Sequence, residues 1–157
     1  MNMYRMTLLT IGSLKSPWIK QGSEDYLARL RKSMRVDLEE LPASKSSDSA
    51  KQREEESARI ERALEKYRDS AVVLLDEKGK PMNSENFAAF IGKHQDLGKP
   101  MCFVIGGAYG LSEHLKKAIG HHVRLSDFTF THEIARLVLL EQLYRASEIL
   151  RGSGYHH

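Results

Sequence analysis

The hydrophobic positions along the chain form short apolar runs separated by amphipathic stretches. Continuous apolar runs of strand length occur at residues 6–11, 71–75 and 101–105. Runs of this kind favour strands that are covered on both faces, as in a parallel sheet. Residues 36–41 alternate apolar with acidic side chains and predict a half-buried strand, and residues 123–126 predict a last short one.

Helical periodicity fills the segments between these strands. The pattern predicts helices over residues 17–32, 51–67, 112–119 and 133–150, and a further helix carries Phe87, Phe90 and Ile91. Strands that alternate with helices along the whole chain predict an α/β fold with a parallel sheet, and 157 residues fit a single domain. The core residues expected from the first helix are Trp18, Tyr26, Leu27 and Leu30.

Several polar segments complete this picture. Residues 43–50 predict a loop, and Ser49 with Gln52 predicts a capping box at the start of the helix that follows. The dense Glu and Arg pairing of that helix is typical of a solvated face. Residues 76–81 predict a turn after the strand that ends at Leu75.

The parallel sheet indicates where function should lie. In open parallel sheets, ligands bind beyond the carboxyl ends of the strands. Functional residues are therefore expected after Leu75, after Ile105 and after Leu125.

A glycine-rich turn follows the strand at residues 101–105. Gly106, Gly107 and Gly110 stand within five positions, between a buried strand and a helix. Glycine permits positive φ and close approach of a ligand to the backbone, so both a binding turn and a plain tight turn fit the pattern. No Lys-Ser/Thr pair follows, which argues against a P-loop and nucleotide hydrolysis.

Residues 125–132 leave the last strand and carry two phenylalanines, Phe128 and Phe130. A solvated loop does not normally keep such side chains, so we expect this loop to pack inside the protein or around a ligand. Its backbone groups need hydrogen-bond partners. The edge of an adenine ring could supply them.

The last helix has two unusual features. Leu137 to Leu140 place apolar side chains on every side, so the helix is either central to the fold or shared with a second subunit. Arg136 stands near the helix start, where the helix dipole disfavours a cation. An anionic substrate is one reason for its placement. Glu141 and Arg145 are spaced for a structural ion pair.

Composition narrows the classes of protein. The net charge of +3 permits a polyanionic partner without requiring one. The single cysteine, Cys102, excludes an internal disulfide and suits a reducing cytoplasm. Residues 6–11 are too short for a signal-peptide core or a membrane span. Adjacent His121 and His122 lack the spacing of a helical metal-ligand pair, so no metal is expected.

Four motifs together resemble one known family. They are IGGAYGL at residues 105–111, LSDFTFTHEIAR at 125–136, LEQLYRA at 140–146 and GYHH at 154–157. This combination resembles the bacterial large-subunit ribosomal RNA methyltransferase H family, the YbeA-like pseudouridine N3-methyltransferases. The resemblance covers essentially the full chain, more loosely in its N-terminal half.

The resemblance implies a fold, an assembly and a substrate. It implies the SPOUT fold, an α/β domain with a C-terminal trefoil knot, and a homodimer that uses S-adenosylmethionine. The implied substrate is a pseudouridine in a hairpin loop of 23S ribosomal RNA, recognised on the assembled ribosome. The residues implied for the cofactor are Leu75, Gly106, Leu125, Ser126, Asp127, Phe128, Thr129 and Phe130.

A mechanism follows as a hypothesis. The imide nitrogen of the base must lose a proton, so His132 is a candidate acceptor and Arg136 a candidate cation for the developing charge. Tyr155 and His156 are expected to close over the RNA base. The family commonly has proline where this chain has Thr131, and threonine should still cap the helix.

Two alternatives remain at this level. One is a SPOUT methyltransferase that acts on transfer RNA, which shares fold and cofactor and differs only in substrate. The other is a non-catalytic ribosome-binding factor, which predicts no binding of S-adenosylmethionine.

Overall fold

The computed structural model of the protein describes residues 3–154, and its centre is a parallel sheet. The five strands lie in the order β2-β1-β4-β3-β5. Strands and helices alternate along the chain as the hydrophobic pattern predicts. The strands are β1 (Tyr4–Ile11), β2 (Met34–Leu41), β3 (Ala71–Pro81), β4 (Met101–Ile105) and β5 (His121–Arg124). The helices are α1 (Pro17–Leu30), α2 (Ser49–Leu64) with a 3-10 turn η1 (Glu65–Tyr67), α3 (Ser84–Asp96), α4 (Glu113–Ala118) and α5 (His132–Arg151).

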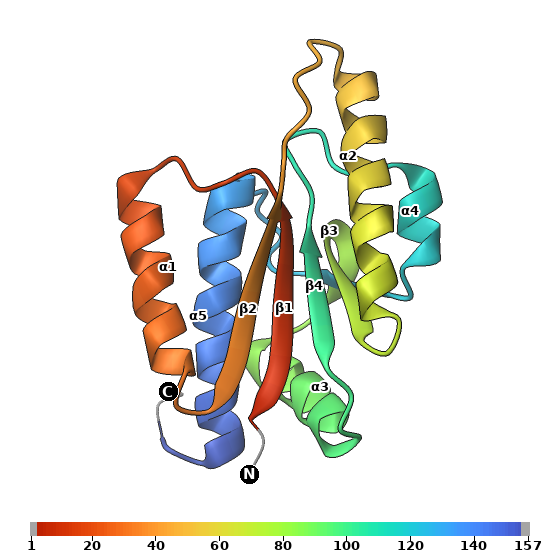
Figure 1. Ribbon diagram of the computed structural model, residues 1–157. Helices are drawn as coiled ribbons and strands as arrows, with labels where there is room; N and C mark the ends of the chain where they lie inside the picture. The colour runs from red at the N-terminus through yellow and green to blue at the C-terminus, as the bar shows by residue number, and fades with distance from the viewer. Residues whose placement is uncertain (1–2, 155–157) are drawn as a thin grey trace.

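Helices cover both faces of the sheet (Figure 1). Helices α1, α3 and α5 pack on one face, and α2 and α4 pack on the other. Successive strand residues point to opposite faces, so β4 supplies both cores: Phe103 to the first, Cys102 and Val104 to the second. This confirms the expected strands covered on both faces. Cys102 is fully buried, and burial raises the pKa of its thiol to about 12, which makes it a poor nucleophile.

Helix α5 lies between α1 and α3 and against the sheet (Figure 1). Leu139, Leu140 and Leu143 are fully buried in the core. Leu137 packs against α1, where a Cβ on Gly22 would come within 3.2 Å of its Cδ1. The central position of the helix within one chain therefore accounts for Leu139 and Leu140, whereas Leu137 and Val138 are only half-buried.

Strand β3 runs past the position where the sequence predicts a turn. It continues to Pro81, and Val123 of β5 pairs both with Leu75 and with Lys80. The four residues between, 76–79, form an outward bulge that we call the β3 lobe. Gly79 packs directly on β5, since a Cβ there would lie 2.7 Å from the backbone of Val123. The turn-forming residues of this segment therefore mark a bulge inside a strand.

Helix α2 is less uniformly solvated than its charge pattern indicates. Glu56 and Ser57 are buried and accept hydrogen bonds from the backbone N–H groups of Ser44 (2.9 Å) and Ser112 (2.8 Å). The predicted capping box is wrong by one residue. The N-cap is Asp48, whose carboxylate accepts from the N–H of Ala50.

The chain reaches α5 from the edge of the sheet. After β5, residues 125–131 pass the carboxyl ends of β3 and β4 and enter the central helix (Figure 1). This route is consistent with the implied C-terminal trefoil knot, which stays a prediction. In the part of the chain that the structure describes, no helix is long and apolar enough to cross a membrane.

Candidate functional site

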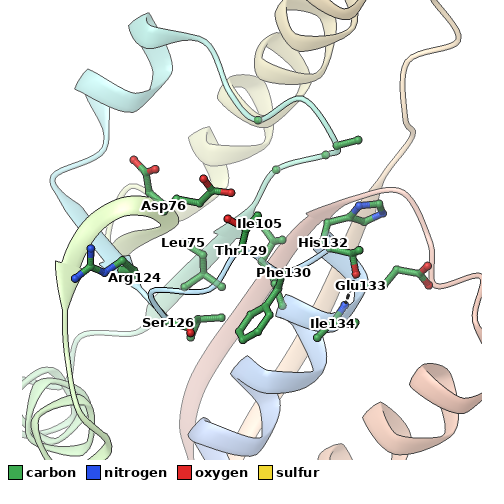
Figure 2. A pocket seen from close by; sticks show the side chains of 18 of the residues that line it. Leu75, Asp76, Ile105, Arg124, Ser126, Thr129, Phe130, His132, Glu133 and Ile134 are labelled. Carbon is green, nitrogen blue, oxygen red and sulfur yellow. Dashed lines mark hydrogen bonds between the residues drawn. The ribbon is translucent and has the colours of Figure 1, made fainter.

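A pocket of about 920 Å³ opens where the strands end. Its walls come from the segments after β1, β3, β4 and β5 and from the first turn of α5 (Figure 2). All three strand ends that the sequence analysis singles out border it, at Leu75, Ile105 and Leu125. The position agrees with the general rule for ligand sites in parallel sheets.

The glycine-rich turn forms one wall. The N–H of Gly110 donates to the carbonyl of Gly107 (3.1 Å), and Gly110 takes a left-handed conformation with φ of +72°. A Cβ on Gly107 would lie 2.5 Å from Oε1 of Glu56, and one on Gly106 would lie 3.1 Å from Leu111. Neighbouring side chains thus crowd Gly106 and Gly107, the positive φ favours glycine at Gly110, and the turn also borders the pocket.

The loop after β5 forms the opposite wall. Ser126 accepts the N–H of Phe128 (3.0 Å), which folds the loop back on itself. Within residues 3–154, no backbone-to-backbone hydrogen bond engages residues 126, 127, 129 or 130. Peptide groups that are left open toward a pocket are suited to bind the polar edge of a ligand.

The β3 lobe is held against the end of α4 by a histidine. Nδ1 of His122 lies 3.3 Å from the carboxylate of Asp76, which also accepts the N–H of Lys78 (3.1 Å). Nε2 of the same ring lies 2.8 Å from the carbonyl of Lys116 and 2.9 Å from that of Ile119. Asp76 is thereby fixed beside Leu75 in the pocket wall (Figure 2).

The first turn of α5 closes the pocket. Thr131 caps the helix, with its hydroxyl accepting the N–H of Ile134 (3.3 Å), so threonine replaces the family's proline without loss of the helix start. Glu133 accepts the N–H groups of Ser16 (3.1 Å) and Lys15 (2.6 Å). These two backbone bonds lower the pKa of the Glu133 carboxyl. They tie the start of α1 to the start of α5, next to His132 (Figure 2).

Arg136 does not line this pocket. Its side chain is 3% exposed and donates to Glu40 (2.7 Å), Thr10 (2.8 Å) and the carbonyl of Gly12 (3.1 Å). The anionic substrate that the sequence offered as one reason for its placement is not needed to explain it. The carboxylate of Glu40, whose side chain is 40% exposed, and two further acceptors explain it, by joining α5 to the carboxyl ends of β1 and β2.

The structure brings most of the implied residues together. Seven of the eight cofactor positions line the pocket, and so does His132. Asp127 does not, because its exposed carboxylate turns away to pair with Arg124 (3.1 Å). Tyr155 and His156 lie outside the described residues. Among those that are described, no group of three or more His, Cys, Asp or Glu could hold a metal ion.

Other pocket residues were not found by the sequence analysis. Trp18 was expected in the core, yet it is 63% exposed at the pocket. The wall after β1 was missed, although Gly12 and the polar residues Ser13, Lys15 and Ser16 follow that strand directly. The remaining pocket residues that it missed include Ser16, Ile19, Asp76, Lys78, Tyr109, Lys116, Arg124 and Glu133.

The pocket fits an adenosine-containing methyl donor. Leu75, Ile105 and Leu125 offer apolar surface for a flat ring, and the open peptide groups of residues 126, 129 and 130 can bind its edge. The volume lies in the range of sites for ligands of that size, about 300 to 1,000 Å³. Neither a covalent nucleophile nor a metal is needed to transfer an already activated methyl group.

Comparison with known proteins supports this interpretation. The chain is 38% identical to proteins named ribosomal RNA large subunit methyltransferase H from Trichlorobacter lovleyi and Geotalea daltonii, over 98% of this chain and 99% of each relative. The relative of that name from Geobacter sulfurreducens is 34% identical over the same shares.

Solved structures share the fold. A probable methylase family protein from Haemophilus influenzae superposes with a TM-score of 0.54 at 13% identity, covering 99% of this chain and 71% of that one. A probable methyltransferase from Bordetella pertussis superposes with a TM-score of 0.53 at 11% identity, covering 92% of this chain and 96% of that one. The sequence profile described as "Predicted SPOUT methyltransferase" matches residues 4–156. The sheet is parallel and its strand ends form one pocket. Because the profile also matches nearly the whole chain, the protein belongs to the SPOUT methyltransferase family.

Proposed function

We propose that this protein methylates N3 of a pseudouridine in a hairpin loop of 23S ribosomal RNA, on the assembled ribosome, with S-adenosylmethionine as the methyl donor. The observation that carries the proposal is the pocket. It gathers seven of the eight cofactor positions implied by the sequence motifs, in a chain 38% identical to a relative named ribosomal RNA large subunit methyltransferase H. A cytoplasmic location accords with that substrate.

The methyl donor would lie between the glycine turn and the loop after β5. Leu75 and Leu125 would contact the adenine faces, and Gly106 would let the backbone approach. The open peptide groups at Ser126, Thr129 and Phe130 would bind the ring edge. Because the Asp127 side chain points away, we assign that residue a backbone contribution only.

When bound, S-adenosylmethionine supplies an activated methyl group. The chain's own task is to orient the base and remove the proton from its imide nitrogen, and holding two reactants together supplies much of the rate. His132 is the candidate proton acceptor, because it stands in the pocket wall at the start of α5. Arg136 becomes a positioning residue, since it holds that helix in place from behind.

The assembly would be a homodimer of two such domains, each formed by residues 1–157. Tyr155 and His156 at the C-terminal end are proposed to cover the base. The tail follows α5 directly, and α5 begins at the pocket wall and ends at Arg151.

The decisive experiment has two arms. Mass spectrometry of 23S ribosomal RNA from cells with and without the gene should show one methylated pseudouridine that depends on the gene. Purified protein should transfer methyl groups to assembled ribosomes and not to transfer RNA. Transfer to transfer RNA alone would favour the first alternative, and calorimetry without any binding of S-adenosylmethionine would favour the ribosome-binding factor.

Substitution of His132 tests the proposed proton acceptor. His132→Ala should lower turnover by roughly 100-fold or more, as loss of a general base does, with unchanged affinity for S-adenosylmethionine. His114→Ala is the matched control, because His114 is 80% exposed on α4 and pairs only with Glu61 among the described contacts. Equal turnover of the two variants would remove His132 from the mechanism.

A further inference from the structure

Three large aromatic side chains are exposed to solvent at the rim of the pocket. Trp18 is 63% exposed, Tyr109 is 53% exposed and Phe128 is 82% exposed, and all three line the pocket. Clustered exposed apolar groups mark interaction sites more often than isolated ones do. They come from three separate segments, the start of α1, the glycine turn and the loop after β5.

Trp18 belongs to the part of the wall that the cofactor positions leave free. It lies in the first turn of α1, two residues after Ser16. The backbone of Ser16 and Lys15 is fixed by Glu133, so the indole stands on a segment anchored to the first turn of α5. His132 is the neighbour of Glu133 in that same turn, which places the candidate proton acceptor and the indole on one wall.

We propose that Trp18 is the stacking platform for the RNA base that receives the methyl group, in a nucleobase subsite between the starts of α1 and α5. The proposal rests on the proposed function and names its acceptor subsite. The implied cofactor positions lie at the ends of β3, β4 and β5, whereas this wall carries none of them. A pyrimidine that leaves an RNA loop needs an aromatic face and polar groups for its edge. Trp18 offers the face, and the hydroxyl of Ser16 with the ring of His132 offers the polar groups.

The charges around the pocket suit the same occupant. Lys78, Lys116 and Arg124 line it beside the carboxylates of Asp76, Glu77 and Glu133. The ammonium of Lys116 is only loosely paired, 3.7 Å from Glu113. Phosphate contacts position an RNA strand while base contacts select the nucleotide. The cations on the β3 lobe and on α4 would contact a phosphate, and the indole on α1 would contact the base.

The kinetic test compares two replacements of the same residue. Trp18→Leu keeps an apolar side chain but removes the aromatic face, whereas Trp18→Tyr keeps a ring. With assembled ribosomes as substrate, Trp18→Leu should lower kcat/KM by about 10- to 100-fold, with the affinity for S-adenosylhomocysteine unchanged, and Trp18→Tyr should stay within about threefold of the wild type. Leu97→Ala, which trims a 68% exposed leucine outside the pocket, is the control.

A second measurement does not depend on catalysis. Trp18 is the only tryptophan in the chain, so its fluorescence reports on this position alone. With S-adenosylhomocysteine saturating, a uridine-rich oligonucleotide added to millimolar concentration should quench it, and the oligonucleotide without uridine bases (an abasic strand) should not.

Three results would overturn the proposal. Loss of S-adenosylhomocysteine affinity in Trp18→Leu would assign the residue to the cofactor, and dissociation of the variant to monomers would assign it to a subunit contact. Full kcat/KM in Trp18→Leu, or absent quenching by the oligonucleotide, would show that no base stacks there. If wild-type protein modifies no ribosomes, the proposed function fails, and the quenching experiment still decides whether Trp18 stacks on bases.

Discussion

Arg136 connects three segments that are far apart in the sequence. Its guanidinium lies between Glu40 on β2, Thr10 on β1 and the carbonyl of Gly12, while its Nε has no partner in the described structure. Loss of the guanidinium would leave the buried hydroxyl of Thr10 without its donor, which is costly for a buried acceptor. The position of α5, and with it the pocket wall at His132, therefore depends on a side chain that never reaches the pocket.

Removal of this guanidinium should destabilise the protein. Arg136→Met keeps the apolar stem but loses the hydrogen bonds, and we expect the free energy of unfolding to fall by roughly 2–3 kcal/mol in urea titrations. Arg151→Met, which removes a largely exposed partner of Glu148, should cost less than about 1 kcal/mol. If Arg136→Met has the same free energy of unfolding as the wild type but a turnover lower by roughly 100-fold, Arg136 would again be assigned as the cation that stabilises the developing charge.

The carboxylate of Glu133 should make stability depend on pH. The N–H groups of Ser16 and Lys15 stabilise its charged form, so its folded pKa lies below its ordinary value. A carboxyl of this kind adds stability above the unfolded pKa of about 4.3 and loses it as pH falls through the folded pKa. Glu133→Gln should therefore flatten the decline in unfolding free energy between about pH 5 and pH 3, compared with the wild type.

Glu54→Gln is the control for this measurement, since it removes an exposed carboxylate from α2. If both variants give the same pH profile, the backbone hydrogen bonds to Glu133 do not stabilise the native state.

At this scale the sequence reveals positions better than it reveals orientations. Leu75, Gly106 and Leu125 could be placed at strand ends because apolar runs stop there. That Trp18 faces solvent and Arg136 faces the interior could not be read from helical spacing. Each depends on which neighbouring element covers that side of the helix, which is a matter of tertiary contacts.

Helix α2 allows a matched test of its cap. Asp48 accepts the N–H of Ala50, whereas the hydroxyl of Ser49 makes no cap bond. Asp48→Ala should lower the free energy of unfolding by about 1 kcal/mol, and Ser49→Ala should change it by less than about 0.5 kcal/mol. Thermal denaturation of both variants checks this, and the reverse order would restore the capping box predicted from the sequence.

The elements themselves follow closely from hydrophobic periodicity, with one instructive exception. The strand ends of β1 and β4 agree with the apolar runs, because burial on both faces demands continuous apolar residues. The β3 lobe was mistaken for a turn, since glycine and proline signal both turns and bulges. Only the pairing of Val123 with both Leu75 and Lys80 distinguishes them, and that pairing spans more than forty residues of chain.

The whole molecule is expected to work as a dimer. Sedimentation equilibrium at micromolar concentration should give twice the chain mass of 17.9 kDa. Leu139 is unsuitable for a disruptive substitution, because it is fully buried within one chain and a charge there would unfold the protein. A mass of one chain across the micromolar range would contradict the dimer.

The fold class could be predicted from the sequence, but the assembly could not be derived in the same way. Alternating strands and helices leave few arrangements besides a parallel sheet. The apolar run in α5 suggested either a central helix or a subunit interface. Burial between α1 and α3 accounts for Leu139 and Leu140, and Leu137 and Val138 are half-buried in the single chain. The dimer therefore rests on the family resemblance rather than on that helix.

The central place of α5 has a consequence for biogenesis. Helix α5, which is synthesised after all five strands, supplies Leu139, Leu140 and Leu143 to the core beneath α1 and α3, and every strand pairing is parallel and non-local. Such topologies fold slowly, because distant segments must meet before they are stabilised. While the C-terminal residues are still inside the exit tunnel, the nascent chain must expose the apolar face that α5 later covers. The emerging polypeptide would then present a binding surface for chaperones until its release from the ribosome that makes it.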